Sequence, residues 1–201
     1  MKRPRPGGRT AETRKVVFAA AETLLAEKEA AAISMVEVAT HAGVAASSLY
    51  RRWGDVRALL TDAAVERLMR EAPLPDTGSL HGDLRTWART MAASLASPQG
   101  SAFFRVAIDA APRSPAEGAS RAHILAPRLE QIAAMLERAR ARGEAAPSVQ
   151  EVADYLLAPL YMRALYGRPA DEAVADTLVA TLLRISCELR GLRSRGTETP
   201  R

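Results

Sequence analysis

The sequence predicts an all-α fold, because apolar residues recur at helical spacing along nearly the whole chain and helix-capping patterns precede them. Val17, Ala20, Ala21 and Leu24 show that spacing, since residues three and four apart share one face of a helix. No run of β-branched residues alternates with polar ones, so no sheet is predicted. A chain of 201 residues suffices for one or two domains, each with a core.

Four helices are predicted before residue 72. The first follows Thr10 as its cap. Ser34 and Glu37 have the spacing of a capping box, in which each side chain binds the other residue's backbone amide as the second helix starts. Gly43 ends that helix, because glycine adopts the backbone that turns the chain. The third helix covers about 46–53, and the fourth runs from its cap Asp55 to about 71.

The stretch 72–78 holds two prolines and a glycine, which interrupt the helical pattern and mark a domain boundary. Beyond it, serine caps and proline at the first helical position mark new helix starts. These starts are Ser79, Ser97-Pro98, Ser114-Pro115 with Glu117, and Ser148 with Glu151. Helix ends are expected at Gly143, Gly167 and Gly191, and Pro127 and Pro159 should kink or divide their helices.

Composition excludes several classes of protein. No apolar run is long enough to span a membrane, and residues 1–9 lack the apolar segment of a secretory signal. The single cysteine, Cys187, allows no intramolecular disulfide and no cysteine metal cluster. It is most simply a small buried residue, with oxidant sensing as the alternative. These absences indicate a cytoplasmic protein.

The positive charge lies mostly near the N-terminus. Residues 1–70 hold 12 basic and 8 acidic side chains, against 16 and 15 in residues 71–201. A basic end on a nearly neutral body suggests an attraction to phosphates, although charge alone favours a solvated tail that aids solubility.

Residues 34–53 have the pattern of a helix-turn-helix, in which two short helices meet at a tight turn. Ala39 is small enough for the second helix to cross closely, and Gly43 permits a left-handed turn. Val44 and Leu49 would fill the angle between the helices. The other face of the second helix is thereby left free for a DNA groove.

This region resembles the TetR family of transcriptional regulators. The matching pieces are Ser34, Val38-Ala39, Ala42-Gly43-Val44, Leu49-Tyr50-Arg51-Arg52-Trp53 and Ala58-Leu59-Leu60, in the family's order and spacing. The resemblance implies a three-helix DNA-binding domain of the helix-turn-helix type joined to a helical domain for ligand binding and dimerisation. On this basis we divide the chain into a basic flexible arm (1–9), a DNA-binding domain (10–71), a ligand-binding and dimerisation domain (79–191) and a disordered tail (192–201).

The resemblance also implies which residues contact DNA, with Leu49 and Trp53 in the core. Serine hydroxyls at a helix start can bind phosphate oxygens, and arginine can bind phosphate or read guanine. Ser34 could contact a phosphate besides capping its helix, or only cap it. The expected DNA-binding residues are Ser34, Ala45, Ala46, Ser47, Ser48, Tyr50, Arg51, Arg52 and Arg57.

Three positions depart from the family pattern. Ala45 replaces the usual serine, so the recognition helix lacks that side-chain cap. Glu29 replaces a glycine, which would let the first helix continue through Ala30–Ala32. Val56 stands where a lysine is usual, and Arg57 next to it would face about 100° away.

Two helices, at about 149–166 and 170–190, are expected to pair the subunits of a homodimer. Their apolar faces are wide, as in a helix packed on two sides, although ordinary core packing gives the same periodicity. On the second helix the predicted stripe comprises Val174, Leu178, Thr181, Leu182 and Ile185, with Val179, Leu183 and Leu189 beside it.

Six of the nine aromatic residues lie after the boundary, where they could line an apolar cavity. Taken singly, each of them is more often a core residue. The candidate ligand-binding residues are Trp87, Met91, Phe103, Phe104, Ile108, His123, Met135, Tyr155 and Tyr161. They imply an apolar small-molecule effector. The three histidines are too scattered for a metal site, and neither a metal nor a cofactor is expected.

The leading hypothesis is a ligand-responsive repressor that binds a palindromic operator in double-stranded DNA as a homodimer. The alternatives are an activator, or a DNA-binding module controlled by a protein partner without a small ligand. An all-α enzyme is not expected, because no catalytic constellation or phosphate-binding loop occurs in the sequence. A structural interaction protein would leave residues 34–53 unexplained.

Overall fold

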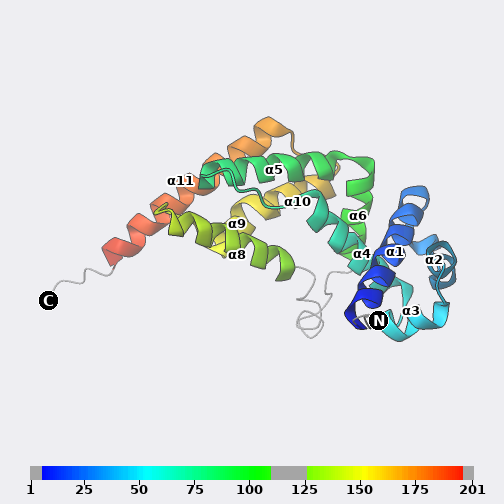
Figure 1. Ribbon diagram of the computed structural model, residues 1–201. Helices are drawn as coiled ribbons and strands as arrows, with labels where there is room; N and C mark the ends of the chain where they lie inside the picture. The colour runs from blue at the N-terminus through cyan, green and yellow to red at the C-terminus, as the bar shows by residue number, and fades with distance from the viewer. Residues whose placement is uncertain (1–5, 110–125, 197–201) are drawn as a thin grey trace. The chain divides into compact units, whose positions relative to one another are not determined.

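The computed structural model describes residues 6–109 and 126–196, which form helices joined by short connections (Figure 1). No strand occurs within these two ranges, which confirms the predicted all-α class. The described residues fall into two compact units. The first lies within 1–68 and 102–121, and the second within 69–101 and 122–201.

The first unit holds the four predicted N-terminal helices. They are α1 (Pro6–Glu27), α2 (Met35–Ala42), α3 (Ala46–Trp53) and α4 (Val56–Glu71), whose last residues belong to the second unit. Two boundaries differ from expectation. The helix α1 begins at Pro6, so residues 6–9 are helical and not part of a flexible arm, and residues 1–5 lie outside the described range. It ends at Glu27, and Ala30–Ala32 form a separate 3-10 turn instead of prolonging it.

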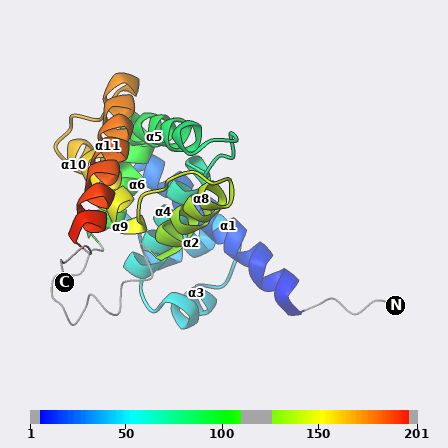
Figure 2. The same cartoon turned by 90° about the vertical axis from the view of Figure 1, so that its left-hand side faces the viewer.

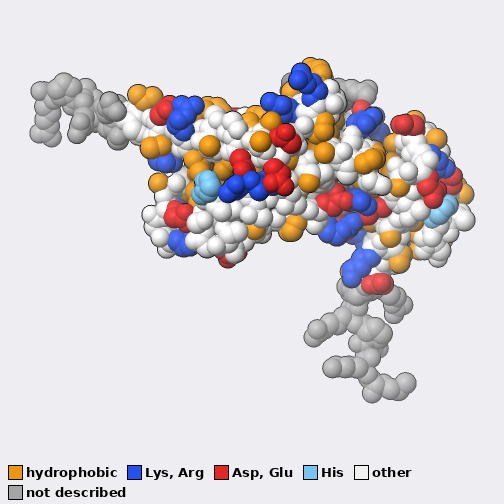
Figure 3. All heavy atoms as spheres, turned by 90° about the horizontal axis from the view of Figure 1, so that it is seen from above, with side chains coloured by type: hydrophobic (Ala, Val, Ile, Leu, Met, Phe, Trp, Pro, Cys, Tyr) orange, Lys and Arg blue, Asp and Glu red, His pale blue; other side chains and the backbone are white. Residues whose placement is uncertain are grey.

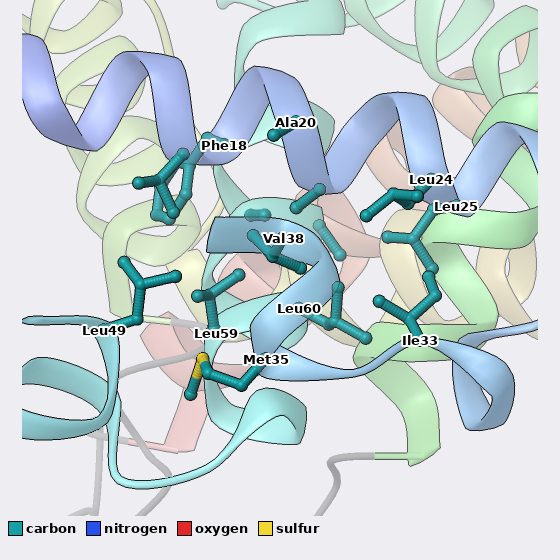
Figure 4. Packing of buried hydrophobic residues seen from close by; sticks show 14 of the residues in the cluster. Phe18, Ala20, Leu24, Leu25, Ile33, Met35, Val38, Leu49, Leu59 and Leu60 are labelled. Carbon is teal, nitrogen blue, oxygen red and sulfur yellow. The ribbon is translucent and has the colours of Figure 1, made fainter. Parts of the chain in front are cut away.

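An apolar core joins these helices. Figure 4 shows Phe18 and Leu24 of α1 pointing towards α2 and α4, with Val38, Leu59 and Leu60 between them. Val38 and Leu59 are fully buried. The helices α2 and α3 have eight residues each, and helices of that length are unstable alone in water. This core therefore determines whether they form and at what angle they meet.

The second unit contains the remaining helices. They are α5 (Leu80–Ala96), α8 (Ala126–Ala141), α9 (Val149–Val152), a π-helical segment (Ala153–Leu157), α10 (Ala158–Leu165) and α11 (Glu172–Gly196). The helix α6 (Pro98–Asp109) begins in this unit and ends in the first. The helices α5 and α11 lie side by side in both views (Figures 1 and 2).

Most predicted helix ends are confirmed. Ser79 caps α5 by accepting from the amide of Gly82, and Ser97 accepts from Gly100 as α6 begins. Ser148 and Glu151 form the expected capping box of α9. Gly143 and Gly167 adopt positive φ after α8 and α10. The capping pattern predicted at 114–117 lies outside the described residues.

The C-terminal helix is longer than predicted. Gly191 does not end it, because α11 continues to Gly196, so residues 192–196 are helical and not a disordered tail. Its buried stripe also differs from the predicted one and consists of Ala175, Val179, Leu182 and Ser186. Alanine and serine at two of these positions allow close packing against neighbouring helices. Val174, Leu178, Thr181 and Ile185 are only half-buried.

Pro159 comes two residues after the π-helical segment and lies in the first turn of α10, so the α-helical pattern is interrupted close to this proline, as predicted. Pro127 is the second residue of α8 and lies next to the edge of the described range, so the kink or division expected there stays a prediction. Over residues 6–109 and 126–196, no helix is long and apolar enough to cross a membrane.

Gly43 offers a test of the turn between α2 and α3. Its φ of 65° is unfavourable for residues with a Cβ atom, whereas the space around it is open. Gly43→Ala should therefore lower the free energy of unfolding by about 1 kcal/mol through backbone strain alone. Gly43→Asn should cost less, because asparagine tolerates this conformation. Urea unfolding at a fixed protein concentration measures both changes, and an alanine variant as stable as the wild type would contradict the argument.

Candidate nucleic-acid interface

The turn between α2 and α3 is fixed by local hydrogen bonds. The Ser34 hydroxyl accepts from the Glu37 amide at 3.2 Å, and the Glu37 carboxylate accepts from the Ser34 amide at 3.2 Å. This confirms the predicted capping box. At the other end of α2 the amides of Gly43 and Val44 donate to the carbonyls of Thr40 and Ala39. The chain therefore leaves α2 in one defined direction.

The helix α3 is held by one face. Leu49 is 1% exposed and packs in the core of the first unit, as Figure 4 shows. Trp53 is half-buried, and its indole nitrogen donates to the Asp62 carboxylate of α4 at 3.1 Å. The rings of Trp53 and Phe18 lie 6.1 Å apart, centre to centre. These contacts connect α3 to both α1 and α4.

Asp62 was not recognised from the sequence. The only signal was a carboxylate among the apolar positions of the fourth helix, and its partner lies nine residues earlier on another helix. Val36, which is 58% exposed in the first turn of α2, was also missed. Single exposed apolar side chains are common on protein surfaces, so the sequence offered no reason to single it out.

The opposite face of α3 carries the side chains predicted to contact DNA. Tyr50 is 50% exposed, and Ser47 and Arg51 are exposed beside it. Ala45 is exposed at the N-cap, while Ala46 and Ser48 are half-buried. Because Ala45 has no side-chain oxygen, the first amides of α3 are not capped by it. Amides at a helix start attract anions, so this end of α3 suits a phosphate.

The remaining predicted DNA contacts have partners within the first unit. The Arg52 guanidinium lies over the Trp53 ring, 4.8 Å from its centre, and the residue is exposed. Exposed Arg57 donates to the backbone carbonyl of Asp109. Arg57 would have to give up that carbonyl to bind a phosphate, whereas Arg52 can reach outward from its ring. Val56 is half-buried, as expected of a residue that makes no phosphate contact.

A charged pair supports the capping box. The Lys28 ammonium is hydrogen-bonded to the Glu37 carboxylate. This hydrogen bond, followed by the one from the Ser34 amide, lowers the pKa of Glu37 below its usual value of 4.5. Glu37 is therefore ionised at neutral pH, and its charge lies at the N-terminal end of α2, where the helix dipole favours it.

The predicted ligand-binding residues are divided between the two units. Trp87, Met91 and Met135 are buried in the second unit, and Tyr155 and Tyr161 are half-buried there. Phe103 and Phe104 are buried in the first unit instead, where the Arg67 guanidinium lies 4.5 Å from the centre of the Phe103 ring. Ile108 is 37% exposed, and His123 lies outside the described residues.

The structure corrects one further expectation. Cys187 is exposed on α11 and is not the buried residue predicted. Among the described residues, no three histidine, cysteine, aspartate or glutamate side chains are grouped so that they could hold a metal ion.

A capped helix, a left-handed turn and a second helix with an exposed polar face define a helix-turn-helix DNA-binding protein. Comparisons with known proteins agree. The protein-family model described as "Bacterial regulatory proteins, tetR family" matches residues 17–63. A second family model, described as "Tetracyclin repressor-like, C-terminal domain", matches residues 74–182. The chain belongs to the TetR family, which consists of transcriptional regulators and not of enzymes, as the sequence predicted.

Two relatives and one solved structure are similar over much of the chain. The regulator AqdR of Rhodococcus erythropolis is 37% identical over 136 residues, which span 68% of this chain and 65% of AqdR, slightly less than two thirds of its length. The regulator YdeS of Bacillus subtilis is 29% identical over 183 residues, or 90% and 89% of the two chains. The crystal structure of the TetR-family regulator SCO0332 has a TM-score of 0.73 and 29% identity, covering 86% of this chain and 97% of that one.

The lowered pKa of Glu37 predicts a pH dependence. Ionised Glu37 stabilises the fold at pH values above 4.5, and this contribution is lost as the pH falls through the lowered pKa. The difference in free energy of unfolding between wild type and Glu37→Gln should therefore be largest near neutral pH and shrink in acid. Urea unfolding across this range measures it. Lys28→Met should weaken the dependence, and a difference independent of pH would contradict the assignment.

Proposed function

We propose that the chain is a ligand-responsive repressor that acts in the cytoplasm and binds a palindromic operator as a homodimer. The observation that carries the proposal is the division of α3 into two faces. Leu49 is buried on one face, while Ser47, Tyr50 and Arg51 are exposed on the other. A helix held in this way can enter a major groove without unfolding any part of the core.

The exposed side chains suit DNA. Arginine can bind a phosphate or pair with guanine through two hydrogen bonds, and the tyrosine and serine hydroxyls can donate to phosphate oxygens. Ser34 is exposed while it caps the N-terminus of α2. Phosphates bind at helix N-termini, so the Ser34 hydroxyl is placed where it could contact one. We place direct base contacts on Arg51 and Tyr50, and backbone contacts on the serines.

A dimer is proposed through α10 and α11. On α10 and at its C-cap, the apolar side chains of Met162, Leu165 and Tyr166 are 52%, 48% and 73% exposed. On α11, the half-buried residues Leu178 and Ile185 lie beside the buried stripe and not within it. Apolar faces of this kind on two helices are typical of protein–protein contacts, and a second copy of the chain would cover them.

A symmetric dimer would bind an operator with matching twofold symmetry. Two recognition helices placed one DNA turn apart, about 34–36 Å, read two copies of one half-site. A small molecule bound in the second unit would favour an arrangement in which this spacing no longer fits. Effector and operator then weaken each other's binding equally, by about 1–3 kcal/mol in typical cases.

Arg51→Ala tests the interface with DNA. It should weaken binding to DNA selected from a random library by about 1–3 kcal/mol, roughly fivefold to 150-fold. The fold should be retained because Arg51 is exposed. Fluorescence anisotropy with labelled DNA measures the change. Arg184→Ala is a matched control, since Arg184 is an exposed arginine of α11 that pairs with Glu188 of the same helix. Equal effects of the two substitutions would contradict the assignment to α3.

Met162→Glu tests the dimer. A carboxylate at the centre of an apolar contact is costly to bury, so the dimer should dissociate about a hundredfold more readily. Sedimentation velocity over a range of concentrations measures this. Val16→Glu is the control, because Val16 is an apolar residue of α1 that is 39% exposed. A Met162→Glu protein that remains as dimeric as Val16→Glu would exclude this surface.

A further inference from the structure

Two arginines flank a pair of aromatic rings in the first unit. The Arg14 guanidinium lies over the Phe18 ring, 4.8 Å from its centre, and the Arg52 guanidinium lies over the Trp53 ring, also at 4.8 Å. The two rings are 6.1 Å apart, centre to centre. The four side chains therefore form one row, with a cation at each end, that connects α1 to the end of α3.

The two arginines of this row differ in their charge partners. Arg14 forms a salt bridge with the Glu66 carboxylate of α4 at 3.2 Å. Within the residues that the structure describes, exposed Arg52 forms no salt bridge. A guanidinium that lies on a ring is attracted through its flat face, so the N–H groups along its edge remain able to donate. Arg52 thus presents a positive charge and hydrogen-bond donors to the solvent.

The ring beneath Arg52 is fixed by two other helices. The indole nitrogen of Trp53 donates to the Asp62 carboxylate of α4 at 3.1 Å, and the ring lies against Phe18 of α1, which is 2% exposed. Trp53 itself is only half-buried, so part of its ring remains open to the guanidinium. Because contacts with α1 and α4 restrict the ring, they also restrict where the Arg52 guanidinium lies.

Arg52 occupies a flank of α3. Successive residues of an α-helix are about 100° apart, so Arg52 lies about 100° from Arg51 and about 60° from buried Leu49. A helix in the major groove directs its outward face at the base edges, whereas its flanks face the sugar–phosphate backbones that border the groove. The position of Arg52 on α3 therefore suits a phosphate better than a base edge.

We propose that Arg52 binds a phosphate of the DNA backbone, and that Trp53 and Asp62 are positioning residues that orient its guanidinium for this contact. The inference rests on the proposed DNA binding by α3 and specifies the chemistry of one contact. An arginine that is already oriented loses less conformational freedom on binding than an unrestrained one. A phosphate contact also strengthens binding to every DNA sequence alike, because the backbone carries no sequence information.

Arg52→Gln in the full chain tests the phosphate contact. Fluorescence anisotropy should show weaker binding, by about fivefold or more, both to selected DNA and to an unrelated duplex of equal length. The slope of log affinity against log salt concentration should become shallower by about 0.9 for each bound subunit. Arg184→Gln, which removes an exposed arginine from α11, is the control and should leave affinity and slope unchanged. An unchanged slope in Arg52→Gln, or a loss confined to the selected DNA, would overturn the proposal.

A double-mutant cycle tests the positioning role of Trp53. Trp53→Phe keeps an aromatic ring in the core but removes the N–H group that donates to Asp62. It should weaken DNA binding by about threefold to tenfold in the wild-type background, and by less than about twofold when Arg52 is already glutamine. Equal losses in the two backgrounds would show that the ring acts only through the fold, and the positioning role would be overturned.

Two substitutions of Asp62 give an independent test. The amide oxygen of asparagine can still accept from the Trp53 indole, whereas alanine offers no acceptor. DNA affinity should therefore be nearly retained in Asp62→Asn and fall in Asp62→Ala to about the level of Trp53→Phe. Equal affinities of the two Asp62 variants would overturn the positioning role of Asp62.

The matched control is Glu66→Gln, because Glu66 lies on the same helix as Asp62 and pairs with Arg14 at the other end of the row. It should leave DNA affinity unchanged. Circular dichroism and urea unfolding show which variants are folded, and if Trp53→Phe does not fold, the comparison of Asp62→Asn with Asp62→Ala still decides the positioning role.

The two kinds of DNA separate this inference from the proposed function. If selection enriches no sequence but Arg52→Gln still lowers the salt slope on the unrelated duplex, the phosphate contact is supported and operator reading by α3 fails. If selected DNA binds the wild type and Arg52→Gln equally well, the proposed function stands and the phosphate contact is overturned. If the wild type binds neither duplex, both are overturned.

Discussion

The fixed angle between α2 and α3 is the constraint on which the DNA-binding unit depends. Neither eight-residue helix is stable alone, so both rely on contacts with α1 and α4. Leu49 provides the apolar contact, and the hydrogen bond from Trp53 to Asp62 fixes the far end of α3. Because all of these contacts lie on one side, the other side is free to meet a ligand as large as a DNA duplex. The one-sided contacts of α3 thus both hold the helix in place and leave its other face exposed.

The second unit is organised around polar groups that fix helix ends. The carbonyl of Ala72 accepts from both the Trp87 indole and the Arg128 guanidinium, so two other helices hold the chain where α4 ends. On the surface, Arg85 and Arg89 of α5 both bind Asp176 of α11 and lower its pKa. Figure 3 shows basic and acidic side chains lying together in this way on one face. Partly exposed pairs add little stability each, so they align helices that the apolar core already holds.

The sequence predicted those features whose partners lie within a few residues. The capping boxes at Ser34 and Ser148 and the turn at Gly43 depend on atoms at most five residues apart, so their residue types alone reveal them. Contacts between distant segments left no such signal. The partner of Trp53 and the buried position of Arg128 depend on which helices pack together, and periodicity does not determine that. The buried stripe of α11 was misjudged because Ala175 and Ser186 are small residues that a search for large apolar side chains overlooks.

The recognition helix also limits how this chain can read DNA. Ala45, Ala46, Ser47 and Ser48 are short, so they let the start of α3 approach the duplex closely but contribute few hydrogen bonds to bases. If the longer side chains Tyr50 and Arg51 make the base contacts proposed above, each copy would distinguish only a few base pairs. A single copy would therefore discriminate poorly among genomic sites, and pairing through α10 and α11 would combine the selectivity of two half-sites in one binding event. In such a pair, further discrimination would come from the shape and deformability of the DNA between the two half-sites, to which the spacing of the two α3 helices would respond.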